Sequence, residues 1–148
     1  MPIEARLTRL TLRAFDFLAN CLPQKISGPK HLETGQRGEE EAYFYLRNQG
    51  YVMIARNFRN ARSRSELDLV GWDGEILCFI EVKTRNKRDF MPAEAAVDAE
   101  KQRDLSRVAR DFLRKMKGNP QIRFDVVSVY LEDGEAAMEL FKDAFNMS

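Results

Sequence analysis

The feature that most constrains this fold is a pair of apolar segments, residues 66–72 and 75–83, on either side of the dipeptide Asp73-Gly74. Asp-Gly favours a two-residue β-turn of type I′, so the segments are predicted to pair as an antiparallel hairpin. A turn at this dipeptide places Glu66 opposite Glu81. The hairpin therefore brings charged residues together at its open end, where two apolar strands would otherwise continue into a core.

Side chains alternate between the two faces of a strand, so this register divides the hairpin into two faces. One face is wholly apolar and must be buried; it carries Leu67, Leu69, Gly71, Ile76, Cys78, Ile80 and Val82. The other carries Val70, Leu77 and Phe79 near the turn, followed by Asp68, Glu66, Glu81 and Lys83 at the far end. A slip of one residue would mix the faces, which supports the proposed pairing.

The charged end of the hairpin predicts a site for a divalent cation. Glu81 lies opposite Glu66 and diagonal to Asp68, and diagonal neighbours on a sheet are roughly 7–8 Å apart. Adjacent carboxylates repel one another, and Mg²⁺ or Mn²⁺ bound by their oxygens would relieve that repulsion. Lys83 points to the same face and could hold an attacking water or a phosphate oxygen. The alternative is a solvated sheet end on which Glu81 and Lys83 pair with their neighbours.

The rest of the chain predicts an α/β domain with a mixed sheet. A helix is expected from Thr34, as its cap, to Gly50, with Ala42, Tyr43, Tyr45 and Leu46 on its apolar side. A strand follows at residues 51–59. After the hairpin, a long helix begins near Ala93 or Val97, with the core stripe Leu105, Val108, Ala109, Phe112 and Met116. Further strands are expected at residues 122–131 and 136–141.

Residues 1–32 are predicted to form an appendage to a domain at residues 33–148. Residues 5–22 have helical periodicity, Pro23 ends that helix, and residues 23–32 resemble a linker that contains His31. This amphipathic helix is expected to dock on the domain or on a partner, and a helix that lies on a membrane surface is the alternative.

Charge is distributed unevenly, although 24 basic residues nearly balance 23 acidic ones. The middle of the chain carries three basic runs: Arg56, Arg59, Arg62 and Arg64; Lys83, Arg85, Lys87 and Arg88; Lys101, Arg103, Arg107, Arg110, Arg114, Lys115 and Lys117. A basic region can hold a polyanion such as nucleic acid even when the net charge is near zero. Solvated helix and loop surface is the alternative interpretation.

Several classes of protein are not expected from this sequence. Cys21, Cys78 and His31 are the only cysteines and histidine, which excludes a zinc site of the usual spacing. Cys78 lies in an apolar run and is predicted to be a buried thiol, and no disulfide is expected. The sequence has no secretory signal and no apolar run long enough for a membrane span, so a cytoplasmic location is predicted.

The hairpin motif resembles the core of PD-(D/E)XK nucleases, with "ELDLV" and "FIEVKTR" supplying Asp68, Glu81, Val82 and Lys83. Longer segments, "GQRGEEEAYFYLRNQGYVMIARNFR", "MPAEAAVDAEKQRDL" and "RFDVVSVY", resemble the YraN family of small bacterial proteins. That family is related to archaeal Holliday junction resolvases. The resemblance covers roughly residues 33–145 and implies a restriction-endonuclease-like, three-layer α/β fold. Residues 1–30 have no counterpart in the family pattern.

The resemblance also implies roles for individual residues. Asp68 and Glu81 would be metal ligands, joined by the Val82 carbonyl, and Lys83 would position or activate water. Glu39 lies where related resolvases place a helix glutamate near the metal.

Glu66 matches a Gly-Glu-x-Asp pattern in which this chain has Ser65 in place of glycine, and Lys101 matches a recurrent lysine that would contact phosphate. The DNA backbone would be held by Arg56, Arg59, Arg62, Arg64, Arg85 and Arg88.

The implied function is Mg²⁺- or Mn²⁺-assisted phosphodiester hydrolysis by an endonuclease. Arginine–phosphate contacts carry no sequence information, so structured or branched DNA is the expected substrate. Two cuts in a duplex would suit a homodimer. Two alternatives stay open: a nucleic-acid-binding protein without turnover, and a scaffold that binds a partner through its N-terminal helix.

Overall fold

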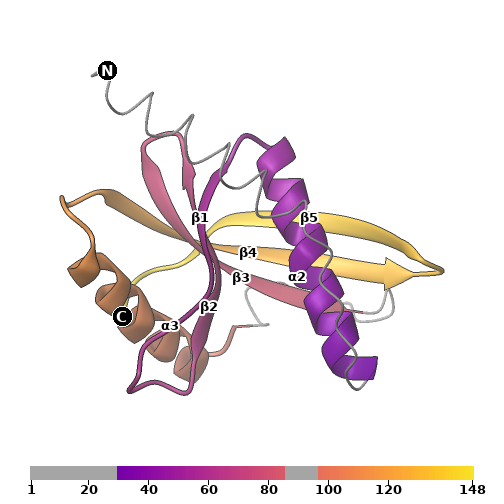
Figure 1. The fold of residues 1–148 in the computed structure, drawn as a ribbon, viewed down its shortest axis with the longest axis horizontal. Coiled ribbons are helices and arrows are strands. Elements are labelled where there is room, and N and C mark those ends of the chain that lie inside the picture. The colour runs from indigo at the N-terminus through magenta and orange to yellow at the C-terminus, as the bar shows by residue number, and fades with distance from the viewer. Residues whose placement is uncertain (1–29, 86–96) are drawn as a thin grey trace.

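The computed structural model describes residues 30–85 and 97–148, which form an α/β domain (Figure 1). Along the chain the described elements are α2 (Lys30–Asn48), β1 (Val52–Arg59), β2 (Glu66–Asp73), β3 (Ile76–Arg85), α3 (Ala99–Lys115), β4 (Gln121–Glu132) and β5 (Glu135–Phe145). This order confirms the predicted sequence of helices and strands, and β5 is longer than expected. The predicted helix at residues 5–22 and Arg88 lie outside the described residues.

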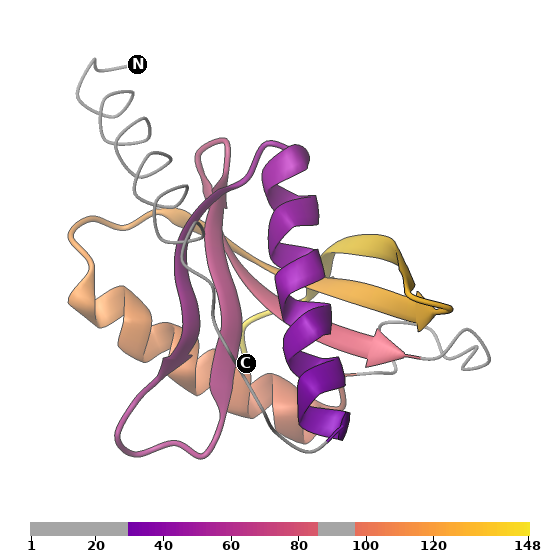
Figure 2. The same cartoon turned by 45° about the vertical axis from the view of Figure 1, so that its right-hand side comes forward.

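The strands form one mixed sheet in the order β1-β2-β3-β4-β5. β3 and β4 are parallel, and the other neighbouring strands are antiparallel. A parallel pair needs a crossover connection, and α3 lies between β3 and β4 in the chain. The crossover places α3 on the opposite face of the sheet from α2 (Figure 2).

Apolar side chains fill the space between each helix and the sheet, which gives the three expected layers. On one face Ala42, Tyr43 and Leu46 of α2 pack with sheet residues that include Leu69, Cys78 and Ile80. On the other face Leu105, Val108 and Ala109 of α3 pack with Val70, Leu77 and Phe79. Both predicted helix stripes and the buried Cys78 thiol are confirmed. Neither described helix is long and apolar enough to cross a membrane.

The β2–β3 hairpin forms, but its register differs from the prediction by two residues. Asp73 pairs with Ile76, so the turn consists of Gly74 and Glu75, not of Asp73 and Gly74. Gly74 has a φ of 61° at the first turn position, as in a type II′ turn. The predicted pairing of Glu66 with Glu81 is therefore wrong.

Tertiary contacts explain this shift. Asp73 remains in β2, where its carboxylate accepts hydrogen bonds from Arg123 at 2.7 Å and from Lys142 at 2.8 Å. In the predicted register Asp73 would be a turn residue, with its side chain displaced from these two cations. Charge-assisted bonds of this kind are stronger than neutral ones, and they favour the observed pairing.

A shift of two residues keeps each apolar side chain of the hairpin on its predicted face, with one exception. Leu67 packs with Val70 beneath α3, not with Leu69 beneath α2. The β2–β3 ladder ends at the Leu69–Ile80 pair, whereas β2 continues to pair with β1 as far as Glu66. Beyond Leu69, β2 follows β1 away from β3, which accounts for the reorientation of Leu67.

The observed ends of the two helices agree in part with the ends predicted from the sequence. α2 begins at Lys30, so Thr34 lies within the helix and the predicted cap is wrong. Residues 30–33, which precede Thr34, contain no proline and extend the helix by about one turn. Gly50, with a φ of 94°, ends α2 as predicted. α3 begins at Ala99 after the N-cap Asp98, close to the predicted start near Val97.

Two glycines of α2 give a matched test of this packing. A methyl group added at Gly38 would overlap the Thr84 hydroxyl of β3, whereas one added at Gly35 meets nothing within 4 Å. Gly38→Ala is expected to destabilise the protein by about 1–3 kcal/mol through overpacking. Gly35→Ala should stabilise it by about 0.5–1 kcal/mol because alanine favours the helix. Urea unfolding measures both, and equal effects would contradict the close contact between α2 and β3.

A polar network ties the strands together at the hairpin-turn end of the sheet. Asp125 is fully buried, and its carboxylate accepts hydrogen bonds from Arg123 Nε at 2.7 Å and from the Tyr51 hydroxyl at 3.0 Å. The Asp143 backbone N–H donates to the same carboxylate. Burial and the Asp125 charge raise the pKa of Tyr51, which keeps that hydroxyl protonated as a donor. The network was not predicted from the sequence.

Candidate functional site

The candidate site lies where β2 separates from β3. The last pair of the β2–β3 ladder is Leu69–Ile80, and the next residues outward are Asp68 and Glu81. Asp68 is 8% exposed and Glu81 is 5% exposed, although both side chains are acidic. Buried carboxylates are costly unless they are paired or bind a cation. The end of the ladder therefore leaves two buried acids where β2 and β3 separate, and this part of the hairpin is called the recess below.

Asp68 is held in place by the backbone of β3. Its Oδ2 accepts a hydrogen bond of 2.7 Å from the Val82 backbone N–H. The N–H and C=O of one strand residue point toward the same neighbouring strand. The Val82 carbonyl therefore also faces the side of β3 that β2 has left. This geometry supports the predicted grouping of Asp68 with the Val82 carbonyl.

Glu81 uses only one of its two carboxylate oxygens within the described structure. Its Oε1 lies 2.9 Å from Lys83 Nζ and 3.4 Å from Lys101 Nζ. Its Oε2 is buried and has no hydrogen-bond partner among the described residues. An unsatisfied buried oxygen of a charged group costs at least about 1–3 kcal/mol, and a bound cation would remove that cost.

The electrostatics of the recess also favour a cation. Burial raises the pKa of Asp68, and the neighbouring Glu81 and Glu39 carboxylates raise it further. Burial, followed by the charge on Glu66, likewise raises the pKa of Glu39 on α2. Glu39 thus contributes to the negative field at Asp68. Each of these shifts means that the charged carboxylate is destabilised by its surroundings.

The donor set fits a hard divalent ion that keeps part of its water shell. Asp68, Glu81 and the Val82 carbonyl offer oxygen ligands, which Mg²⁺ and Mn²⁺ prefer. Among the described residues, no three His, Cys, Asp or Glu side chains gather closely enough to form a metal cage by themselves. Mg²⁺ commonly binds through one or two carboxylates plus water and substrate phosphate, and Asp68 and Glu81 offer two carboxylates.

The other predicted site residues lie in different settings. Glu66 pairs with Arg59 at the end of the β1–β2 ladder and does not face Glu81. The Arg56 guanidinium lies over the Tyr43 ring, 4.7 Å from its centroid. Arg85 is the last residue of β3. Lys101, predicted to contact phosphate, lies within ion-pair distance of Glu81, and this contact was not predicted.

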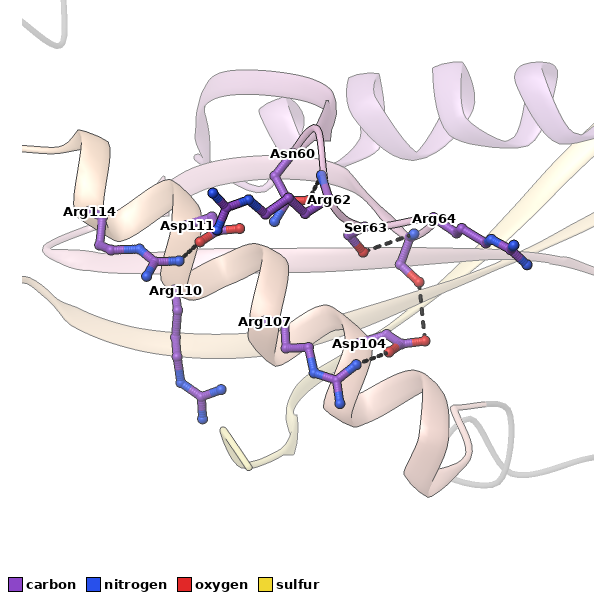
Figure 3. Close-up of a pocket in the computed structure, with 10 residues that line it drawn as sticks. Asn60, Arg62, Ser63, Arg64, Asp104, Arg107, Arg110, Asp111 and Arg114 are labelled. Carbon is purple, nitrogen blue, oxygen red and sulfur yellow. Dashed lines mark hydrogen bonds and ion pairs between the residues drawn. The ribbon is translucent and has the colours of Figure 1, made fainter.

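Arg62 and Arg64 line a pocket of about 460 Å³ between the β1–β2 loop and α3 (Figure 3). The pocket, called the arginine pocket below, is lined by Asn60, Arg62, Ser63, Arg64, Ser65, Asp104, Arg107, Arg110, Asp111 and Arg114. The Ser65 hydroxyl donates to Asp104 at 3.3 Å, which ties the loop to the helix.

The contribution of α3 to this pocket was not predicted. The basic run on α3 is apparent in the sequence, but only Lys101 of that run was predicted to belong to the site. Asp104, Arg107, Asp111 and Arg114 recur at spacings of three and four residues, so they share one face of α3. That spacing was the available signal. It could not indicate which loop the face would meet.

Comparison with known proteins agrees with the motifs. The sequence profile of the family described as "Uncharacterised protein family UPF0102" matches residues 38–129. This chain belongs to the UPF0102 family. A UPF0102 protein of Koribacter versatilis is 52% identical over 141 residues, which cover 95% of this chain and 96% of that protein. A UPF0102 protein of Solibacter usitatus is 46% identical over 112 residues, covering 75% of this chain and 84% of that protein.

Membership in UPF0102 confirms the resemblance to the YraN family and corrects one detail of it. The Koribacter versatilis match leaves only about 5% of this chain outside the alignment, so most of residues 1–30 do have a counterpart in that relative. The UPF0102 profile itself begins at Gly38 and includes the hairpin, Glu39 and α3.

Proposed function

We propose that this UPF0102 protein is a metal-dependent endonuclease that hydrolyses phosphodiester bonds in structured or branched DNA. The observation that carries the proposal is the buried Oε2 of Glu81, which has no hydrogen-bond partner among residues 30–85 and 97–148, beside the buried carboxylate of Asp68. Most buried side-chain polar atoms in native proteins have a partner, so this oxygen supports a role for Glu81 in binding a cation.

The residues of the recess have separate roles in the proposed reaction. Asp68, Glu81 and the Val82 carbonyl hold Mg²⁺ or Mn²⁺, and the ion supplies Lewis acidity and charge neutralisation at the scissile phosphate. Lys83, about one-third exposed at the edge of the recess, donates to a water or to a phosphate oxygen. Lys101 adds a second positive charge on the α3 side, which favours binding of an anionic substrate.

DNA is proposed as the substrate because cationic groups surround this recess. Arg62 and Arg64 lie in the loop that leads into β2, and Arg85 ends β3. Arginine contacts with phosphate supply affinity without sequence preference. Recognition then depends on the shape of the DNA, for which branched substrates are the natural candidates. A homodimer would place two such recesses on a duplex.

Cleavage of a DNA panel tests this proposal directly. Labelled four-way junctions, flaps and linear duplexes would be incubated with the purified protein in Mg²⁺, Mn²⁺ or EDTA. We expect nicking that depends on the metal and is faster on branched DNA than on linear DNA. Metal-independent cleavage would assign the activity to a contaminant. Binding without cleavage under all conditions would indicate a DNA-binding protein, and absence of both would favour a scaffold.

A further inference from the structure

The arginine pocket begins one helical turn away from the candidate metal ligands. Lys101 contacts Glu81, and Asp104, three residues later on α3, already lines the pocket. On the opposite wall Ser65 lines the pocket directly before β2, which carries Asp68 three residues further on. The recess and the pocket are therefore successive parts of one surface between the β1–β2 loop and α3.

We propose that the arginine pocket holds the DNA backbone on one side of the scissile phosphate and so sets a minimum length for that arm of the substrate. This inference rests on the proposed function, because it takes the recess as the point of cleavage. It adds a defined set of residues, half of them on α3 and half in the β1–β2 loop, and a defined direction along which the substrate leaves the recess.

The charges in the pocket favour a phosphate-rich ligand. The lining residues include five arginines and only two aspartates, so the pocket carries an excess of positive charge. Asp104 pairs with Arg107 at 3.2 Å, and Asp111 pairs with Arg114. Arg62 and Arg64 form no ion pair with a described side chain, and Figure 3 shows Arg64 extending away from the aspartates. The planar guanidinium group binds phosphate through two parallel hydrogen bonds, which makes arginine the preferred residue for this ligand.

The length of the pocket suits several consecutive phosphates. An α-helix rises about 1.5 Å per residue, so Arg107 lies roughly 9 Å and Arg114 roughly 20 Å beyond Lys101 along the axis. Phosphates on one strand of a duplex are spaced about 3.4 Å apart along its axis, so this span covers roughly three to six nucleotides from the cleavage point. A single phosphate or a mononucleotide would occupy only part of it.

Two variants change the pocket in opposite directions without touching the metal ligands. The double variant Arg62→Ala/Arg64→Ala removes two arginines that have no described ion-pair partner, so folding should be retained. Asp111→Asn removes a negative charge and releases Arg114. Arg47→Ala is the matched control, because Arg47 belongs to α2 on the opposite face of the sheet.

The test is fluorescence anisotropy of labelled four-way junctions in EDTA at several NaCl concentrations. The double variant should bind more weakly and reduce the slope of log affinity against log salt by about two, since each lost phosphate contact reduces it by about one. Asp111→Asn should bind more tightly than wild type, and Arg47→Ala should match wild type. A damaged fold cannot produce the gain that Asp111→Asn predicts.

Substrate length gives the second arm of the test. Junctions with one arm shortened below roughly six base pairs should lose affinity in the wild type and show no further loss in the double variant. Three results would each overturn the inference. The double variant could bind DNA as tightly as Arg47→Ala, Asp111→Asn could show no gain in affinity, or the wild type could bind no DNA. Binding is measured without metal, so it is independent of cleavage. If affinity depended on the arginine pocket but no DNA were cleaved, the proposed nuclease activity would be wrong and the pocket would still be a DNA-binding site.

Discussion

Glu81→Gln is expected to reduce the rate of DNA cleavage by at least about a hundredfold, which corresponds to a loss of roughly 2.7 kcal/mol of transition-state stabilisation. Glutamine keeps the shape of the side chain but removes the negative charge that would hold the cation. It also leaves Lys83 and Lys101 without their shared anionic partner. The measurement is the single-turnover cleavage rate on the best substrate of the DNA panel.

Glu75→Gln is the matched control for this experiment. Glu75 is an exposed residue in the turn of the same hairpin, at the opposite end of β2 and β3 from the recess. The two variants make the same chemical change on the same hairpin, so they separate loss of the site from a general effect of charge. If Glu81→Gln cleaved as fast as Glu75→Gln, the assignment of Glu81 to the reaction would be wrong.

Arg123→Ala is expected to lower the free energy of unfolding by about 3–5 kcal/mol. The Arg123 side chain is 13% exposed, and it donates to the fully buried Asp125 through both Nε and Nη2. It also contacts Asp73 and the Tyr51 hydroxyl. Removing it leaves the Asp125 carboxylate buried with only neutral donors, and such an uncompensated charge is strongly destabilising. Urea unfolding monitored by circular dichroism measures the effect.

Two further variants test whether the loss of stability arises from the buried network around Asp125. Arg107→Ala removes an ion pair to Asp104 in which the Arg107 side chain is 68% exposed, so it should change stability by less than about 1 kcal/mol. The double variant Arg123→Ala/Asp125→Ala should be less destabilised than the sum of its single variants, because the stranded charge is gone. A loss from Arg123→Ala no larger than that from Arg107→Ala would show that the network contributes little to stability.

Hydrophobic alternation was enough to predict which apolar residues of the hairpin face each layer, except for Leu67. Leu69, Cys78 and Ile80 share one face, and Val70 and Phe79 share the other, because a pairing shift of two residues leaves alternation unchanged. The position of the turn was not predictable in this way. Asp133 and Gly134 both have positive φ and form a two-residue turn between β4 and β5, which is the type of turn predicted at Asp73-Gly74. At the latter, ion pairs from Arg123 and Lys142 retain Asp73 in the strand.

Strand parity and the family motif both point to Asp68, Glu81 and Lys83 as candidate site residues, and the structure buries both carboxylates and pairs Lys83 with Glu81. Contacts that depend on the approach of distant elements were not found. Lys101 reaches Glu81 only because α3 crosses back over the sheet, and Asp125 meets Tyr51 across 74 positions of sequence. The arginine pocket likewise depends on the loop after β1 folding against α3. No local pattern in a single sequence specifies which surfaces will meet in this way.

The most direct test of the account is calorimetric titration of the metal-free protein with Mn²⁺ and with Mg²⁺. It would be made on the wild type, on Asp68→Asn/Glu81→Gln, and on Glu75→Gln. The account predicts saturable binding by the wild type and by Glu75→Gln, and loss of that binding in the double variant. If the double variant bound the cations as the wild type does, or if the wild type bound neither, then Asp68 and Glu81 would not form a metal site.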